Sequence, residues 1–158
     1  MFESHPEDEL LCSNFPKAEI TTRYLKFLIS HEIKETSIGV ITPFKTQVKK
    51  IKSSIKSQDI LVGRPGRFQG QERDVIVLSL VRSNEMGDIE LFTEMERINF
   101  SITRAKRHLA IICDSKTMSN HDLLRDFVEF LQLKAKVIPA QVLQGGLEDM
   151  AKERSSLQ

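Results

Sequence analysis

The chain has 158 residues, which is enough for one domain with a substantial hydrophobic core and too few for two comfortable ones. Its 40% hydrophobic and 28% charged residues are typical of a globular protein, and no apolar run approaches the ~18 residues of a membrane span. The two cysteines lie far apart and the four histidines lack metal-ligand spacing, so the sequence predicts neither a disulfide framework nor a metal site. We expect an intracellular protein without a membrane partner.

The formal net charge of +1 does not indicate a partner, but the distribution of the charges does. Residues 45–73 contain only two acids, Asp59 and Glu72. The same stretch carries a series of lysines and arginines, namely Lys45, Lys49, Lys50, Lys52, Lys56, Arg64, Arg67 and Arg73. A basic stretch inside a neutral chain is compatible with a polyanionic partner. For the lysines alone, a solvated helix face is the simpler explanation.

Hydrophobic spacing and turn residues predict the elements in chain order. Residues 1–16, which contain two prolines, are predicted as an irregular N-terminal segment. Apolar residues at helical spacing predict helices at residues 18–35, 44–57, 92–105 and 121–133. Short apolar runs, largely β-branched, predict strands at residues 38–42, 60–62, 74–81 and 108–113, with a last short one at 137–138. A loop is predicted at residues 84–88 and a turn at 114–117.

The alternation of strands and helices predicts the fold class. It favours a single α/β domain at residues 17–139, with one parallel sheet and helices on both of its faces. Residues 140–158 contain a Gly-Gly pair and a mixed polar end, and are predicted as a tail or a linker stub. Ligands of such sheets bind at the carboxyl ends of the strands. We therefore expect functional residues at that edge or in the adjoining loops.

The first informative motif is residues 97–113, which read Arg-Ile-Asn-Phe-Ser-Ile-Thr-Arg-Ala-Lys-Arg-His-Leu-Ala-Ile-Ile-Cys. Its predicted helix has a polar stripe with Thr103 and Arg104, and it runs directly into a hydrophobic strand. This arrangement places one guanidinium at the lip of the sheet, where it can contact a phosphate. A planar, permanently charged guanidinium stabilises a phosphoryl group in transfer better than an ammonium does. Taken alone, a salt bridge to a neighbour on the helix explains Arg104 more simply.

The second motif, residues 68–74, reads Phe-Gln-Gly-Gln-Glu-Arg-Asp and also opens onto a strand. Gly70 permits a positive φ or a close backbone approach. Gln69 offers a donor and an acceptor, and Glu72 can accept from hydroxyls such as those of a ribose. A polar turn before a strand explains the same residues equally well.

Two further pairs lie at predicted strand ends. Thr42 and Pro43 follow the first strand, where a hydroxyl and exposed backbone N–H groups can hold a nucleic-acid phosphate. Arg82 and Ser83 follow the central strand and have the same potential. Both pairs are also compatible with plain strand termination.

In this order and spacing, the motifs resemble the second RecA-like domain of superfamily 1 helicases that translocate 5′ to 3′, the group containing the nonsense-mediated-decay helicases. Residues 68–84 are similar to motif V and its following strand, and residues 97–106 to motif VI. Residues 40–47 are similar to the family's Thr-Pro-aromatic segment. Residues 107–120 resemble the immunoglobulin-mu-binding-protein type most. The resemblance covers roughly residues 8–139.

The resemblance implies a RecA-like (P-loop NTPase-type) sheet and the C-terminal motor domain of an ATP-dependent helicase in the nucleus or the cytoplasm. Arg104 would be the arginine finger toward the γ-phosphate of ATP, whose Mg²⁺ is held mainly by the first RecA-like domain. The nucleotide side of the cleft would contain Gln69, Gly70 and Glu72. Single-stranded DNA or RNA would contact Thr42, Pro43, Arg82 and Ser83. The expected partners are therefore the nucleic acid and the first RecA-like domain of the same helicase.

The chain also departs from the family pattern. It contains no Gly-x-x-x-x-Gly-Lys-Ser/Thr loop, no acidic Walker-B-like strand end and no opening Gln-Tyr-Arg segment, so we expect a fragment or truncated product that is inactive alone. Where the family has a Ser or Thr, an apolar residue and an Asp, this chain has Arg64, Pro65 and Gly66. Arg64 can replace the phosphate contact by charge, while Pro65 lacks a backbone donor. The alternative is a non-catalytic nucleic-acid-binding or interaction module, and a helicase–nuclease with its nuclease elsewhere stays open.

Overall fold

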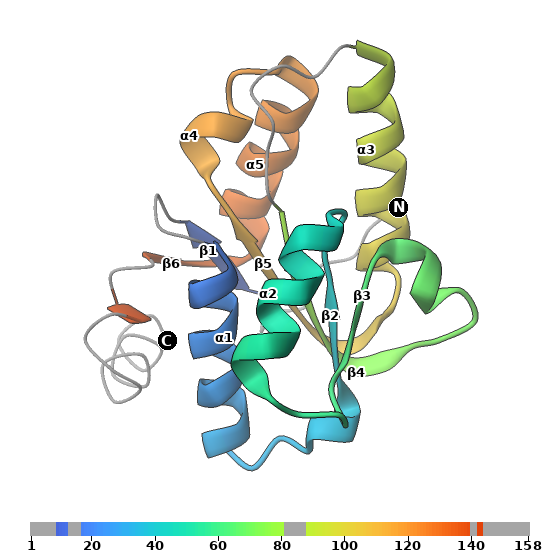
Figure 1. Ribbon diagram of the computed structural model, residues 1–158. Helices are drawn as coiled ribbons and strands as arrows, with labels where there is room; N and C mark the ends of the chain where they lie inside the picture. Colours follow the sequence, from blue (N-terminus) through green and yellow to red (C-terminus); the bar gives the residue numbers. More distant parts are fainter. Residues whose placement is uncertain (1–8, 13–16, 81–87, 140–141, 144–158) are drawn as a thin grey trace.

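The computed structural model describes residues 9–12, 17–80, 88–139 and 142–143, and its arrangement is shown in Figure 1. Its six strands form one sheet in the order β3-β2-β4-β5-β1-β6, and all neighbouring strands are parallel. The strands are β1 (Glu9–Cys12), β2 (Ile38–Ile41), β3 (Leu61–Gly63), β4 (Arg73–Ser79), β5 (Ala105–Cys113) and β6 (Lys136–Pro139). The predicted fold class, an α/β domain built on a parallel sheet, is confirmed.

Helices cover both faces of the sheet because the strands alternate their apolar side chains. On β4, Val75 and Val77 pack against the cluster that contains α1 (Lys17–Ser30) and α2 (Lys45–Ile55). The intervening Ile76 and Leu78 pack on the opposite face. That face carries η2 (Pro65–Phe68), α3 (Asp88–Ile102), α4 (Ser115–Met118) and α5 (Asp122–Lys134). Figure 1 shows α1 and α2 side by side on one face, with α3 and α5 behind the sheet.

The prediction that residues 1–16 are irregular is wrong for Glu9–Cys12. These four residues form β1, which lies inside the sheet between β5 and β6. A four-residue run is too short to show a period, and its pairing depends on strands about a hundred residues away. The remainder of that predicted segment lies outside the described residues, and the domain boundaries at 17 and 139 stay predictions.

Smaller differences concern the helices and the turns beside them. α1 stops at Ser30 rather than at residue 35, and Glu32 adopts a φ of 64°, which a continuing helix cannot accommodate. The predicted turn at 114–117 is largely replaced by the short helix α4, which extends to Met118. The third difference is that Thr103 and Arg104 lie in the turn after α3 and not on the helix itself. The short helix η1 (Glu35–Ser37) leads into β2. The other predicted helices and strands match within a few residues, apart from α3, which begins four residues before the predicted 92.

A buried polar cluster joins α1, α2 and β4. The hydroxyl of Ser79 accepts hydrogen bonds from Thr21 Oγ1, at 3.1 Å, and from Gln47 Nε2, at 3.0 Å. All three side chains are buried. Since a buried polar group without its partner is costly, the cluster fixes both helices to the end of the central strand.

We expect Ser79→Ala to lower the free energy of unfolding by about 1–3 kcal/mol, because it leaves two buried groups without this partner. Urea denaturation measures the change. Ser53→Ala is the matched control, since Ser53 is exposed on α2 and only bonds the carbonyl of Lys50 in its own helix. Equal effects of the two substitutions would contradict the role of the cluster.

Candidate nucleotide and nucleic-acid site

The two motifs lie together at the amino edge of the sheet. Gln69, Gly70 and Glu72 precede β4, and Arg104 precedes β5, so both segments lie where these parallel strands begin. The backbone N–H of Arg73 donates to the carbonyl of Arg104 at 3.0 Å and joins the segments. The sequence favoured the carboxyl edge or the adjoining loops. The carboxyl edge is wrong for these two motifs, since residues that precede a parallel strand lie at its opposite end.

Phe68 anchors the second motif to the sheet. Its side chain is fully buried in the cluster on the α3 face. Gly39 of β2 makes room for it, because a Cβ there would lie 2.7 Å from Phe68 Cε1 and 2.8 Å from Ile76 Cδ1. The ring therefore fixes where the following turn begins.

The turn after Phe68 leaves its polar side chains free to contact a ligand. Gly70 has a φ of 70°, which L side chains rarely adopt. The guanidinium of Arg73 stabilises the turn by donating to the Glu72 carbonyl at 2.9 Å and to Gln71 Oε1 at 3.1 Å. Gln69 and Glu72 are exposed. The turn is thus held by its backbone while an amide and a carboxylate face solvent.

Arg104 is held by local contacts and not by a salt bridge. Its guanidinium lies 4.7 Å from the centre of the Phe100 ring, a cation–π distance. Its Nη2 donates to Thr103 Oγ1 at 3.0 Å, and that hydroxyl donates to the Phe100 carbonyl at 2.7 Å. No carboxylate in the described part of the chain forms an ion pair with it. The simpler explanation, a salt bridge on the helix, is not observed among the side chains that the structure describes.

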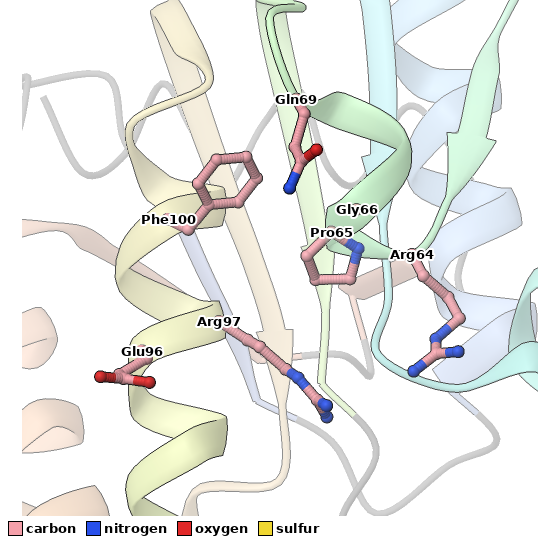
Figure 2. A pocket seen from close by; sticks show the side chains of 7 residues that line it. All are labelled: Arg64, Pro65, Gly66, Gln69, Glu96, Arg97 and Phe100. Carbon is pink, nitrogen blue, oxygen red and sulfur yellow. The ribbon is translucent and has the colours of Figure 1, made fainter.

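A cavity of about 510 Å³ connects the two motifs across η2 and α3. Figure 2 shows Gln69 directed between Phe100 and Pro65, with Arg64 and Arg97 extending past Pro65. The lining residues are Arg64, Pro65, Gly66, Gln69, Glu96, Arg97 and Phe100. Phe100 contacts the Arg104 guanidinium with its ring and also lines the cavity. Sequence reasoning assigned no role to Arg97 or Phe100, although their spacing of three on a helix places them on one face.

The residues predicted to contact nucleic acid are not collected on the surface. Thr42 is fully buried, its hydroxyl has no partner among the described residues, and its N–H donates to the Gly63 carbonyl at 3.1 Å. Pro43 is buried as well. Its carbonyl accepts a hydrogen bond from Arg64 Nε at 2.9 Å. Arg64 is exposed, so its guanidinium is presented to solvent beside the buried Thr42 and Pro43. Arg82 and Ser83 lie outside the described residues.

Two absences hold for the part of the chain that the structure describes. No group of three or more His, Cys, Asp or Glu side chains is arranged to hold a metal ion. No helix there has the length and apolar character needed to cross a bilayer.

Comparisons with known proteins place the chain among helicase domains. A family model described as an AAA domain matches residues 3–116. The DNA-binding protein SMUBP-2 of Rattus norvegicus is 33% identical over 132 residues, which are 82% of this chain and 13% of that protein. DNA polymerase alpha-associated DNA helicase A of Schizosaccharomyces pombe is 35% identical over 129 residues, covering 80% and 20% of the two chains. The regulator of nonsense transcripts 1 homolog of Drosophila melanogaster is 34% identical over 121 residues, covering 71% and 10%.

The chain thus spans a fifth or less of the length of each of these relatives. Among solved structures, the C-terminal domain of a possible DNA helicase from Lactobacillus plantarum WCFS1 has a TM-score of 0.54 at 11% identity. The match covers 85% of this chain and 86% of that domain, and it supports the fold alone. From the family model and the helicase relatives together, the chain belongs to the AAA domain family and is a helicase domain of superfamily 1.

Proposed function

We propose that the chain is the C-terminal motor domain of an ATP-dependent superfamily 1 DNA/RNA helicase of the immunoglobulin-mu-binding-protein type. Arg104 is its arginine finger, and Gln69, Gly70 and Glu72 form its part of the nucleotide cleft. One observation carries the proposal: a guanidinium without a described carboxylate partner lies beside an exposed polar turn, and a backbone hydrogen bond joins the two. An arginine retained only for stability has no need of this arrangement.

The residues of this edge fit part of an ATP site. A guanidinium suits phosphate oxygens, and the exposed Gln69 amide and Glu72 carboxylate suit ribose hydroxyls and polar base edges. The described residues contain no cluster of carboxylates for Mg²⁺. We therefore assign most of the triphosphate and its Mg²⁺ to the first RecA-like domain and expect no hydrolysis by this chain alone. ATP supplies the free energy of phosphoryl transfer, and this chain contributes orientation and charge.

The carboxyl edge is proposed to contact single-stranded DNA or RNA. Because Thr42 and Pro43 are buried, we assign them the role of positioning Arg64, which bonds to the Pro43 carbonyl. The exposed Arg64 guanidinium then provides the positive charge. Arg82 and Ser83, which come after β4 in the sequence, are assigned to the same contact by the proposal. The names of the relatives, a DNA-binding protein and a DNA helicase, support a nucleic-acid partner. A protein of this kind acts in the nucleus or the cytoplasm.

The rival function is a non-catalytic nucleic-acid-binding or interaction module. The segment that departs from the family pattern favours it, since Pro65 begins the helix η2 and removes a backbone donor. The arrangement around Arg104 favours the motor domain, because a binding module requires no finger.

ATP turnover distinguishes the two functions. The chain is assayed alone and mixed with a purified first RecA-like domain from the same source, with and without single-stranded DNA. We expect turnover only in the mixture, with stimulation by the DNA. A silent mixture of domains that demonstrably associate, for example by analytical ultracentrifugation, contradicts the motor-domain proposal and favours the binding module.

A further inference from the structure

A second concave surface lies at the outer edge of the sheet, between α2 and β3. This cavity of about 300 Å³ is lined by five cations and no acid. Its charged residues are Lys45, Lys49 and Lys52 of α2, with Arg64 and Arg67 from the segment after β3. We call these five residues the basic groove. It differs from the nucleotide edge, because α2 starts at the carboxyl edge and runs back along the edge strand β3.

The local structure brings these cations together. The spacing of Lys45, Lys49 and Lys52 places them on one face of α2, while Ile51 is buried on another. A Cβ on Gly63 would lie only 2.5 Å from Arg67 Cδ, so the missing side chain lets the stem of Arg67 lie against the end of β3. The Arg64 guanidinium is held at the mouth of the groove by its bond to the Pro43 carbonyl.

The structure offers no internal reason for this concentration of charge. None of the five cations forms an ion pair with a carboxylate of the described residues, whereas Arg23 and Arg125 pair with acids on their own helices. Lys45 and Lys49 are like charges one helical turn apart, which destabilises a helix. Lys45 also lies in the first turn of α2, where the helix dipole disfavours a cation. A solvated helix face explains exposed lysines, but not their convergence with two arginines in one groove.

We propose that the basic groove binds the phosphate backbone of a nucleic-acid strand, without reading its sequence, as a contact additional to the one at Thr42 and Pro43. Lys45 and Lys52 are about 10 Å apart along the helix axis, so the row of lysines is long enough to contact more than one phosphate of a strand. Arg64 lines both the groove and the cavity beside Gln69, so it connects the carboxyl edge to the groove. This inference rests on the proposed function only in that it takes nucleic acid as the partner.

The salt dependence of binding tests the groove. Affinity of the whole chain for a fluorescent oligothymidylate is measured over a range of salt concentrations for three proteins. They are the unchanged chain, a groove variant (Lys49→Gln, Lys52→Gln, Arg67→Gln) and a control variant (Lys26→Gln, Lys34→Gln, Lys134→Gln). Both variants lose three positive charges, and the three control lysines are exposed outside the groove. All six substituted side chains are exposed and glutamine is polar and uncharged, so thermal unfolding should change little in either variant.

Each lost phosphate contact lowers the slope of log affinity against log salt by about 0.7 for a single strand. We expect the groove variant to lose about 2 units of slope and the control variant close to none. Equal slopes for the groove variant and the unchanged chain overturn the inference, and so do equal losses in both variants or no binding at low salt. The proposed function is judged separately, by ATP turnover in the two-domain mixture, so either can fail without the other.

Discussion

Arg104→Ala is expected to reduce ATP turnover of the reconstituted two-domain protein by about 10³-fold or more, while leaving its affinity for single-stranded nucleic acid nearly unchanged. The reason is geometric and electrostatic. The Arg104 guanidinium lies on the Phe100 ring beside the Gln69–Glu72 turn, where a permanent positive charge can stabilise a phosphoryl group in transfer. Steady-state turnover at saturating ATP and a separate binding titration give the two quantities.

Two companion variants sharpen the interpretation of Arg104→Ala. Arg107→Ala removes an equal charge from an exposed position in β5 to which the proposal assigns no role, and should leave turnover within a few-fold of the unchanged protein. Arg104→Lys keeps the charge and loses the planar fork, so it should recover only part of the activity. If Arg104→Ala weakens turnover and nucleic-acid binding by the same factor, the arginine is structural and the finger assignment fails.

Phe68→Ala is expected to lower the free energy of unfolding by about 3–5 kcal/mol, because it empties a fully enclosed site in the core. A domain of this size has a total stability of about 5–15 kcal/mol, so the variant should be partly unfolded at moderate temperature. Urea denaturation gives the stability. Hydrogen exchange at Gln69 to Glu72 reports whether the turn loses its anchor in the fraction that stays folded.

Two further substitutions test how closely the Phe68 ring fits its site. Phe68→Leu keeps most of the apolar volume and should cost clearly less than Phe68→Ala. Gly39→Val overpacks the same space from β2, where a Cβ would already lie within 2.8 Å of two side-chain carbons, so it should lower the free energy of unfolding by about 1–3 kcal/mol or more. A loss below about 1 kcal/mol for Phe68→Ala would show that the ring does not hold the motif.

Local patterns were sufficient to predict most of the fold. The nearly continuous apolar run of residues 75–80 indicated a central strand buried on both faces, and all six residues are buried. The basic, amphipathic α2 was equally clear from its spacing. Residues 9–12 were missed because nothing local distinguishes them from a loop. Their strand exists through pairing with β5 and β6, and such long-range pairing is not encoded in a short window.

The candidate site was predicted in part. The family resemblance implied that Gln69, Gly70 and Arg104 belong to one cleft, and the structure places both motifs at one edge of the sheet. The carboxyl edge was favoured for them because the general tendency of ligands toward carboxyl ends received too much weight. The burial of Thr42 was not predictable, since a hydroxyl at a strand end lies inside or outside depending on what packs over it. The support of Arg104 by Phe100 depends on where α3 ends, and helix ends are the least certain part of a periodic pattern.

The position of β1 constrains how the chain folds as well as what it looks like when folded. Glu9 pairs in register with Ala110 and with Lys136, so β1 has no neighbour in this sheet until about a hundred further residues have been made. The strands β3 and β4 can each pair with β2 long before that, because the three strands follow each other closely in the chain. β6 is paired with β1 alone and must wait for it. Although β1 precedes the other five strands of this sheet in the chain, it is thus placed among the last, and closing the sheet on that side is the step with the greatest loop-closure entropy.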